Sequence, residues 1–372
     1  SYGEALTRGE IELKYDPQQG GFSAWYFEHR LPIAPERYSE ILRSIAAHDS
    51  ASSNSDSALL AIAARYAGRD NPSRDRASAL KREIAAVEDG EATISRGLAE
   101  TYRAGPDRPA QTQALHHLLE RQNYRLAHWK LATSEINYRR FFDVNELAGL
   151  RVEDRDTFDR IHGLVHRLIA EDKLQGLRLD HIDGLRDPAQ YCQRLARLIR
   201  EAQGPRRRPF YLLVEKILGE WEALPEFSGL DGTTGYEWLN AITHVLADGQ
   251  GLENLDEVWR QASNIAPDFD PVLRAAKRRV LKTLLASEFT VLTRLLARIA
   301  AGHFSTRDYS EDSLRQAFEL FVLHFPVYRT YITPAGPTDG DRALITETIA
   351  KARQDWFAAD DGIFDFLQDA LT

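Results

Sequence analysis

Methionine is absent from this 372-residue sequence, and Cys192 is its single cysteine. One cysteine excludes a disulfide framework and a cysteine-based metal site within one chain. Cys192 falls in a helix-like stretch, so we expect a small buried thiol and not a nucleophile. The absence of methionine, together with a start at Ser1 in what reads as mid-domain sequence, predicts an interior piece of a longer protein.

Long apolar runs are also missing, because no stretch reaches the ~18 consecutive apolar residues of a membrane span. No signal peptide opens the chain. These two absences predict a cytoplasmic protein that does not bind a membrane. The formal charge of -9 is spread along the chain, and no basic stripe stands out that would bind nucleic acid.

Several motifs of well-known chemistries are missing as well. The sequence contains no GxGxxG fingerprint, no Walker P-loop and no GxSxG elbow. His162 and His166 are four residues apart, but no carboxylate pattern completes a metal site around them. His116 and His117 are adjacent, so they would face different ways on a helix. We therefore expect no metal site and interpret these histidines as packed or solvated.

The patterns that are present divide the chain into three regions. Apolar and polar residues alternate over 9–33 around a turn at 18–21, which predicts a β-hairpin. Amphipathic stretches near 36–48, 57–66, 75–89 and 110–120 predict helices, and helical patterns return after Gly235. The predicted domains are 1–123, a β-hairpin plus a helical insertion; 124–235, the central βα units; and 236–372, a mainly helical subdomain.

Strand and helix patterns alternate within the central region. Strand-like segments at 137–142, 176–180 and 210–214 are separated by helix-like segments at 155–170 and 188–202. Such alternation is typical of βαβ units and predicts an α/β protein with a parallel sheet. Fully apolar strands further indicate a sheet that is covered on both faces. The glycine-rich segment 232–235 is predicted to be a tight loop beside it.

Two carboxylates stand at the ends of these predicted strands. Asp180 ends the first strand, and Glu215 follows the second. In parallel folds such as the (β/α)8 barrel, functional side chains gather at the C-terminal strand ends. Arg178 points to the same side as Asp180, because side chains alternate along a strand, and its cation favours the ionised carboxylate. The apolar residues before Glu215 favour a neutral acid, so the pair could supply a nucleophile and a proton donor.

Each carboxylate also has a plain structural interpretation. Arg178 and Asp180 could form a buried ion pair that only fixes a loop. Glu215 could pair with Lys216 or with a nearby arginine. Two strand-end carboxylates separated by one helix are harder to explain in this way. Together they favour the carboxylate pair of a sugar enzyme.

The segments around both carboxylates resemble a known family. Gly176-Leu-Arg-Leu-Asp-His-Ile-Asp-Gly-Leu and the later Leu-Val-Glu-Lys-Ile-Leu resemble the second and third signature regions of the α-amylase superfamily, glycoside hydrolase family 13. More narrowly, they are similar to the maltooligosyltrehalose synthase family. The supporting segments run in order along the chain: Tyr2-Gly-Glu-Ala-Leu-Thr-Arg-Gly-Glu, Glu135-Ile-Asn-Tyr-Arg-Arg-Phe-Phe-Asp-Val-Asn, Asp231-Gly-Thr-Thr-Gly-Tyr and Phe325-Pro-Val-Tyr-Arg-Thr-Tyr.

The resemblance implies a (β/α)8 TIM barrel, incomplete in this chain, with large α-helical insertions. It implies that Asp180 is the nucleophile, that Glu215 is the general acid/base and that Arg178 holds the nucleophile. It places His181 in a sugar subsite. Around the substrate groove it implies a further set of residues: Asp183, Lys216, Tyr236, Tyr138, Arg139 and Arg140.

The activity that this family implies is an intramolecular transglucosylation on a maltooligosaccharide. The α-1,4 bond at the reducing end becomes an α,α-1,1 bond by a retaining double displacement, and neither a metal nor an organic cofactor is implied. Two of the family's motifs, an earlier Asn-His pair and a third carboxylate in a Gly-Val-Glu-Asp-Thr-like segment, do not occur in this sequence. Their absence leaves the activity of this chain alone open.

Three other interpretations stay open at this point. The first is an ordinary retaining α-amylase or glucanotransferase that hydrolyses or transfers α-1,4-glucan. The second is a catalytically incomplete fragment that binds glucan. The third is a helical scaffold without an active site, which would leave Asp180 and Glu215 unexplained. The sequence does not predict an oligomeric state.

Overall fold

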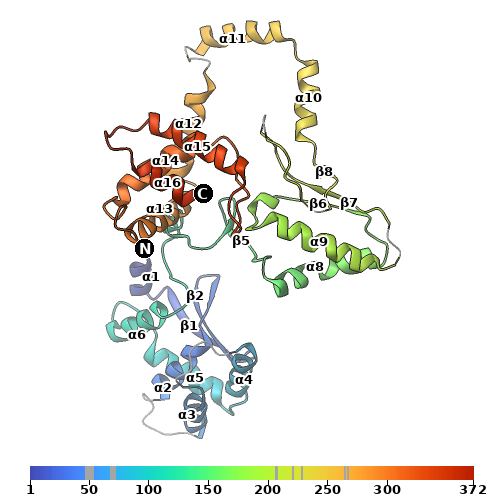
Figure 1. The fold of residues 1–372 in the computed structure, drawn as a ribbon. Helices are drawn as coiled ribbons and strands as arrows, with labels where there is room; N and C mark the ends of the chain where they lie inside the picture. Colours follow the sequence, from blue (N-terminus) through green and yellow to red (C-terminus); the bar gives the residue numbers. More distant parts are fainter. Residues whose placement is uncertain are drawn as a thin grey trace. The chain divides into compact units, whose positions relative to one another are not determined.

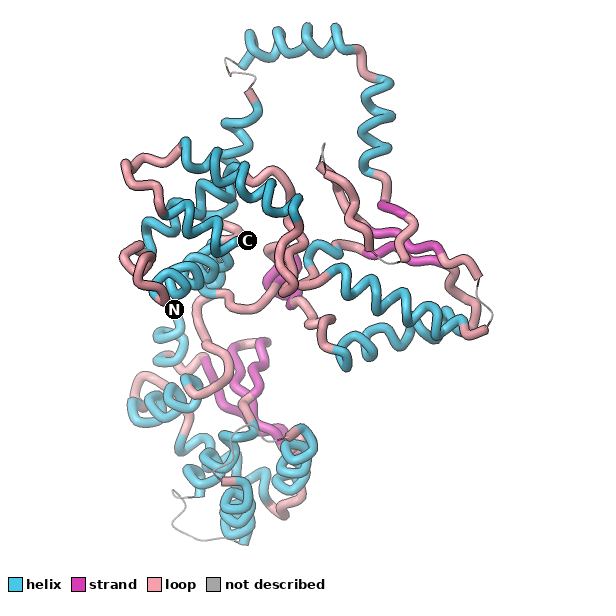
Figure 2. The backbone as a smooth tube through the Cα atoms, viewed as in Figure 1, coloured by secondary structure: helices cyan, strands magenta, loops and turns pink. Residues whose placement is uncertain are grey.

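The structure is a computed structural model that describes residues 1–46, 54–67, 73–205, 208–219, 222–227, 229–263, 265 and 268–372. Its contacts divide the chain into two compact units, Ser1–Leu131 and Ala132–Thr372. Three separate small sheets are present in the described residues, drawn in magenta in Figure 2. The three-region division inferred from the sequence stays a prediction.

The first unit contains an antiparallel sheet of β1 (Ile11–Asp16), β2 (Gly21–Tyr26) and β3 (His29–Pro32). The predicted hairpin over 9–33 is confirmed, and β3 is an additional strand that the sequence did not predict. Ile11 and Leu13 are buried while their neighbours are exposed, as expected for a sheet with one face in the core.

Helices pack around this sheet and bury one apolar core. All four helices predicted in this region are present, while α1 and α5 were not predicted. In α5, Gly97 lies against Ile45 of α2, so the two helices approach closely. The helices of this unit are α1 (Tyr2–Thr7), α2 (Tyr38–Ala46), α3 (Asn54–Tyr66), α4 (Arg74–Ala85), α5 (Gly90–Thr101) and α6 (Pro109–Glu120).

The second unit contains a parallel sheet of β6 (Gly176–Leu179), β7 (Tyr211–Val214) and β8 (Gly232–Thr233), in that order. The helices α8 (Arg155–Ala170) and α9 (Pro188–Gln203) lie along one face of it (Figure 1). The predicted strands and helices between 155 and 214 are therefore confirmed. The predicted tight loop at 232–235 is wrong in its first half, because Gly232 and Thr233 pair with β7.

The prediction that this sheet is covered on both faces is wrong for the residues that the structure describes. Leu212 and Val214 of β7 are buried beneath the helices, whereas Tyr211 is 60% exposed. Within the described residues the sheet is thus covered on one face and not on both. These residues contain three parallel strands, so a complete (β/α)8 barrel is not present among them.

A short antiparallel hairpin replaces the strand that was predicted at 137–142. It consists of β4 (Arg140–Phe141) and β5 (Val144–Ala148). Phe142, between the two strands, has a positive φ of 51°, which turns the chain back on itself. The chain over 137–142 therefore bends where the sequence pattern suggested one continuous strand. The helix α7 (Ala132–Glu135) precedes this hairpin.

The rest of the second unit is helical, as predicted. The last helices bury a core of their own, in which Phe289, Phe318 and Phe364 take part. No residue of the two long helices α10 and α11 is buried. The helices are α10 (Tyr236–Leu246), α11 (Gly249–Ser263), α12 (Phe269–Lys282), α13 (Ala286–Ala301), α14 (Glu311–His324), α15 (Asp339–Gln354) and α16 (Ile363–Leu371). Within the described parts of the chain, none of the helices is long and apolar enough to span a membrane.

The close approach of α5 and α2 can be tested at Gly97. A Cβ added there would lie 2.5 Å from the Cβ of Ile45. We expect Gly97→Ala to lower the free energy of unfolding of the first unit by about 1–3 kcal/mol, because overpacking forces side chains or backbone to shift. Urea unfolding measures the change.

The matched control is Gly163, which lies inside α8 with no atom within 4 Å of an added Cβ. We expect Gly163→Ala to stabilise the second unit by about 0.5–1 kcal/mol, because alanine loses less backbone entropy than glycine on folding. An unchanged unfolding midpoint for Gly97→Ala would contradict the packing described here.

Candidate active site

The register of the parallel sheet brings the two predicted carboxylates together. Leu179 is opposite Val214, and the amide of Glu215 donates to the carbonyl of Leu179 at 2.7 Å. Asp180 and Glu215 therefore follow neighbouring strands at the same level. Because Arg178 is opposite Leu213 and side chains alternate, Arg178, Asp180 and Glu215 share one face. The prediction that both carboxylates stand at strand ends is confirmed.

One guanidinium group contacts both carboxylates. Arg178 donates from Nη1 to Oδ1 of Asp180 at 2.9 Å, and its Nη2 lies 3.6 Å from Oε1 of Glu215. The side chain of Asp180 is 58% exposed, and that of Glu215 is 22% exposed. The pair is thus not the fully buried ion pair that the structural interpretation required. One carboxylate is open to solvent, and the other is more enclosed.

Glu215 is held by two further donors. The backbone amide of His181 donates to Oε2 at 3.0 Å, and the Tyr236 hydroxyl donates to Oε1 at 3.4 Å. His181 adopts a left-handed φ of 47°, a conformation that non-glycine residues rarely hold without support. Tyr236 is the first residue of α10, directly after Gly235. The structure therefore brings His181 and Tyr236 into contact with Glu215, while their roles in a sugar subsite and a substrate groove stay predictions.

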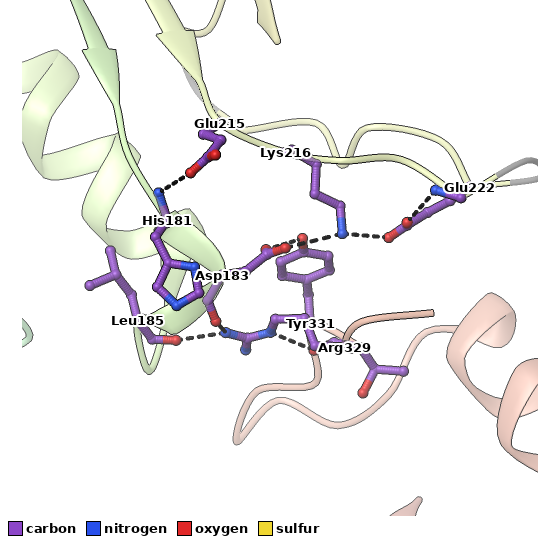
Figure 3. A network of polar contacts seen from close by, with 10 residues as sticks. His181, Asp183, Leu185, Glu215, Lys216, Glu222, Arg329 and Tyr331 are labelled. Atoms are coloured by element: carbon purple, nitrogen blue, oxygen red, sulfur yellow. Dashed lines mark hydrogen bonds and ion pairs between the residues drawn. The ribbon is translucent and has the colours of Figure 1, made fainter. Parts of the chain in front are cut away.

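Asp183 and Lys216 belong to a buried network next to this pair (Figure 3). Lys216 Nζ lies 3.1 Å from Oδ2 of Asp183 and 2.7 Å from Oε1 of Glu222. The Lys216 side chain is 1% exposed, and that of Asp183 is 9% exposed. A lysine buried so deeply needs charged partners, and here it has two. The side chains of Asp183 and Lys216 are thus held in ion pairs within the protein.

Two members of this network come from the helical region and were missed by sequence reasoning. The hydroxyl of Tyr331 donates to Oδ1 of Asp183 at 2.5 Å. Arg329 donates to the carbonyls of Asp183 and Leu185 at 2.7 and 2.6 Å. Burial, followed by the hydrogen bond and charge of Asp183, raises the pKa of Tyr331, so its hydroxyl stays protonated. The segment beginning at Phe325 was noted only for its family resemblance, and no local pattern indicated this contact.

The Tyr138–Arg140 stretch does not act as one group. Arg139 reaches the same turn, because its Nη1 donates to the carbonyl of Gly184 at 3.0 Å. Tyr138 instead donates to the carbonyl of Asn145 within the hairpin, at 2.7 Å. The side chain of Arg140 is 4% exposed and pairs with Glu288 of α13 at 2.7 Å. A place for all three around a substrate groove stays a prediction.

The remaining candidates have structural roles. His162 is buried, and its ring stacks on that of Phe158. Its Nε2 forms a hydrogen bond of 2.9 Å with the hydroxyl of Tyr191. Burial lowers its pKa, so the ring is neutral at neutral pH. Cys192 is fully buried, as expected, and burial raises its thiol pKa to about 11. The residues that the structure describes include no group of three or more metal-ligating side chains.

No protein-family model matches this chain. Two curated proteins of Mycobacterium tuberculosis, from strains CDC 1551 / Oshkosh and ATCC 25618 / H37Rv, are 40% identical to it over 183 residues, 49% of the chain. Both carry the provisional name maltooligosyl trehalose synthase. The solved maltooligosyltrehalose synthase of Arthrobacter ramosus is similar over 99% of the chain, with a TM-score of 0.58 and 26% identity.

The chain is similar to maltooligosyltrehalose synthases. This finding confirms the resemblance predicted from the motifs at Asp180 and Glu215. A solved glycosyltrehalose synthase, with a TM-score of 0.58 and 23% identity, supports the same fold. The chain spans 23% of the length of the curated relatives and 36% of the Arthrobacter enzyme. It thus corresponds to a part of these proteins.

The ion pair of Arg140 with Glu288 makes a testable contribution to stability. Burial alone would raise the pKa of Glu288, but hydrogen bonds from Ser287 and Arg140 outweigh it and lower that pKa. A lowered carboxyl pKa stabilises the fold above the ordinary glutamate value of 4.5, and the stabilisation is lost as pH falls through the folded-state value. We therefore expect the wild type to lose more stability between pH 7 and pH 3 than Glu288→Gln. Thermal unfolding across this range measures the difference, and parallel pH curves for the two proteins would argue against it.

Proposed function

We propose that this chain carries the catalytic pair of a retaining α-glucan-active enzyme. The activity is the conversion of the reducing-end α-1,4 bond of a maltooligosaccharide into an α,α-1,1 bond. One observation carries the proposal: a single guanidinium, that of Arg178, contacts Asp180 and Glu215 at the ends of neighbouring parallel strands. The similarity to maltooligosyltrehalose synthases supports the choice of reaction.

The parallel strands β6, β7 and β8 are, in this proposal, three neighbouring strands of a (β/α)8 barrel. Three observations support this view. The strands are parallel and follow the order of the chain, a helix connects the first two, and the carboxylates lie at their C-terminal ends. Active sites of (β/α)8 enzymes form at this edge.

The spacing of the strands supports a retaining mechanism. Neighbouring strands lie about 4.8 Å apart, and Asp180 and Glu215 follow two such neighbours at one level. Retaining glycosidases hold their two carboxyl groups about 5–5.5 Å apart, whereas inverting enzymes leave room for a water between them. Asp180, paired with Arg178 and open to solvent, is suited to be the nucleophile. The more enclosed Glu215 is suited to be the general acid.

In the first step, Asp180 attacks the anomeric carbon on the non-reducing side of the last α-1,4 bond. Glu215 gives its proton to the glycosidic oxygen, and the terminal glucose leaves with that proton. The products are a glycosyl ester on Asp180 and an ionised Glu215. Hydrogen bonds from the His181 amide and the Tyr236 hydroxyl stabilise this carboxylate and hold its orientation.

In the second step, the released glucose turns and presents its anomeric hydroxyl. Glu215 takes the proton of this hydroxyl while the oxygen attacks the anomeric carbon of the ester, and the bond to Asp180 breaks. An α,α-1,1 bond results, both carboxyl groups return to their first states, and no water is consumed. Water must be kept out while the ester exists, since hydrolysis competes.

Exposed aromatic side chains beside His181 are suited to hold the sugar. The ring centroid of Phe142 lies 4.4 Å from that of His181. The ring centroid of Tyr328, which belongs to another segment, lies 6.2 Å from that of His181. Both aromatic side chains are more than half exposed, at 52% and 62%. An apolar ring with an open face can cover a face of a glucose unit. We therefore propose that the sugar beside the catalytic pair lies between these residues, with Arg178 and His181 contacting its hydroxyl groups.

A direct assay tests the proposed reaction. We expect this chain, incubated with maltopentaose, to consume reducing ends without releasing a matching amount of glucose. Glu215→Gln should lower the rate by about 10²–10⁴-fold, the usual contribution of general acid–base catalysis, and Asp180→Asn should abolish the formation of the ester. Asp159→Asn is the matched control, because Asp159 is an exposed carboxylate of α8 that pairs with Arg155.

The other outcomes identify the rival functions. New reducing ends that depend on Asp180 and Glu215 would indicate a retaining hydrolase or glucanotransferase instead. Binding of maltopentaose without turnover would indicate a glucan-binding chain that needs a further carboxylate. Equal activity in all variants would exclude both carboxylates from the chemistry.

Tyr236 gives a second test of the mechanism. Its ring stands at the start of α10, and its hydroxyl contacts Glu215. We expect Tyr236→Ala to raise the share of substrate that is hydrolysed, because a smaller side chain admits water to the ester. Tyr236→Phe, which keeps the ring, should leave this share near the wild-type value. The ratio of free glucose to non-reducing product measures the share, and an unchanged ratio in Tyr236→Ala would remove this residue from the barrier against water.

A further inference from the structure

The turn that follows Asp180 ends in three consecutive backbone carbonyls that all accept hydrogen bonds from arginines. Residues Ile182–Gly184 form one turn of 3₁₀ helix. Arg329 donates to the carbonyls of Asp183 and Leu185, and Arg139 donates to the carbonyl of Gly184. The last carbonyls of a helical turn have no partner within it, and their partial negative charge favours a cation. Arg329 supplies a positive charge and the donor to two of the three carbonyls.

Arg329 is itself fixed in place. Its Nε donates to the carbonyl of Thr330 at 3.0 Å, and its guanidinium carbon lies 5.0 Å from the centre of the Tyr331 ring. Tyr331 in turn donates to the carboxylate of Asp183. Arg329 and Tyr331, two residues apart in one segment, thus hold the backbone and the side chain of Asp183 (Figure 3).

This turn is coupled to Glu215 through His181. The amide of Gly184 donates to the carbonyl of His181 at 3.0 Å, and a Cβ added to Gly184 would lie 2.6 Å from the His181 ring. The amide of His181 donates to Glu215. A displacement of the turn would therefore displace the donor that orients this carboxylate.

We infer that Arg329 is a positioning residue, which holds the 182–185 turn so that the His181 amide stays aimed at Glu215, and that Tyr331 assists it through Asp183. The segment 325–331, which follows α14 of the helical region, thereby sets the geometry of a site formed on the sheet. The expected effect of Arg329 on turnover rests on the proposed function, whereas its effect on the position of the turn does not.

The experiment compares four variants of the full chain: Arg329→Ala, Arg329→Lys, Tyr331→Phe and, as the matched control, Arg278→Ala. Arg278 is an arginine of α12 that forms a surface ion pair with Glu319. Hydrogen exchange of the peptide covering 179–187 is followed by mass spectrometry. We expect faster exchange in Arg329→Ala, a smaller increase in Arg329→Lys and Tyr331→Phe, and the wild-type rate in the control. A peptide from α15 should exchange at the wild-type rate in every variant, which shows that the fold is kept.

Turnover of maltopentaose supplies the kinetic arm. We expect Arg329→Ala to lower kcat by about 10²-fold, the effect of misplacing a catalytic group by ~1 Å, with little change in KM. Guanidinium ions at low millimolar concentration should restore part of this rate, which loss of stability alone would not allow. Unchanged exchange at 179–187 in Arg329→Ala would overturn the inference, as would a loss confined to KM. If the wild-type chain does not turn over, the proposed function fails in this chain, while the exchange data still decide the role of Arg329.

Discussion

The interaction on which the site depends is the guanidinium of Arg178 between two carboxylates. Arg178 contacts a carboxyl group on each of two adjacent strands and so holds the two groups beside each other. The arrangement requires strands that end at the same level and side chains that alternate in phase, which the pairing of Arg178 with Leu213 provides. The helices α8 and α9 stabilise the sheet from one side. Its other face is therefore free to carry polar side chains.

Local patterns predicted the elements that form the centre of the site, because those elements are long or strongly periodic. The helix α8 covers the residues that its apolar spacing indicated, and β7 is a short apolar run before Glu215. The strand β8 has only two residues, too few for an alternating pattern. The helix α5 was missed because Gly90 and Gly97 weaken its helical signal.

The partners of the turn after Asp180 could not be read from the sequence for a different reason. Arg329 lies 146 residues after Asp183, and it contacts a backbone carbonyl, which every residue possesses. A contact of this kind has no signature in residue type or spacing. Lys216 illustrates a related case: the sequence offered it as a partner of Glu215, its neighbour in the chain, whereas in the structure it pairs with Asp183 and Glu222.

The complete burial of Cys192 has a practical consequence for work on this chain. A thiol reacts as its thiolate, and a buried thiol with a pKa raised to about 11 forms little of it at neutral pH. With no other cysteine and no methionine in the sequence, the native chain offers little sulfur to alkylating or oxidising reagents. A cysteine introduced on an exposed surface would accordingly be the position that takes a fluorophore or spin label. The motions of the 182–185 turn could then be followed from one chosen site, without first removing the native cysteine.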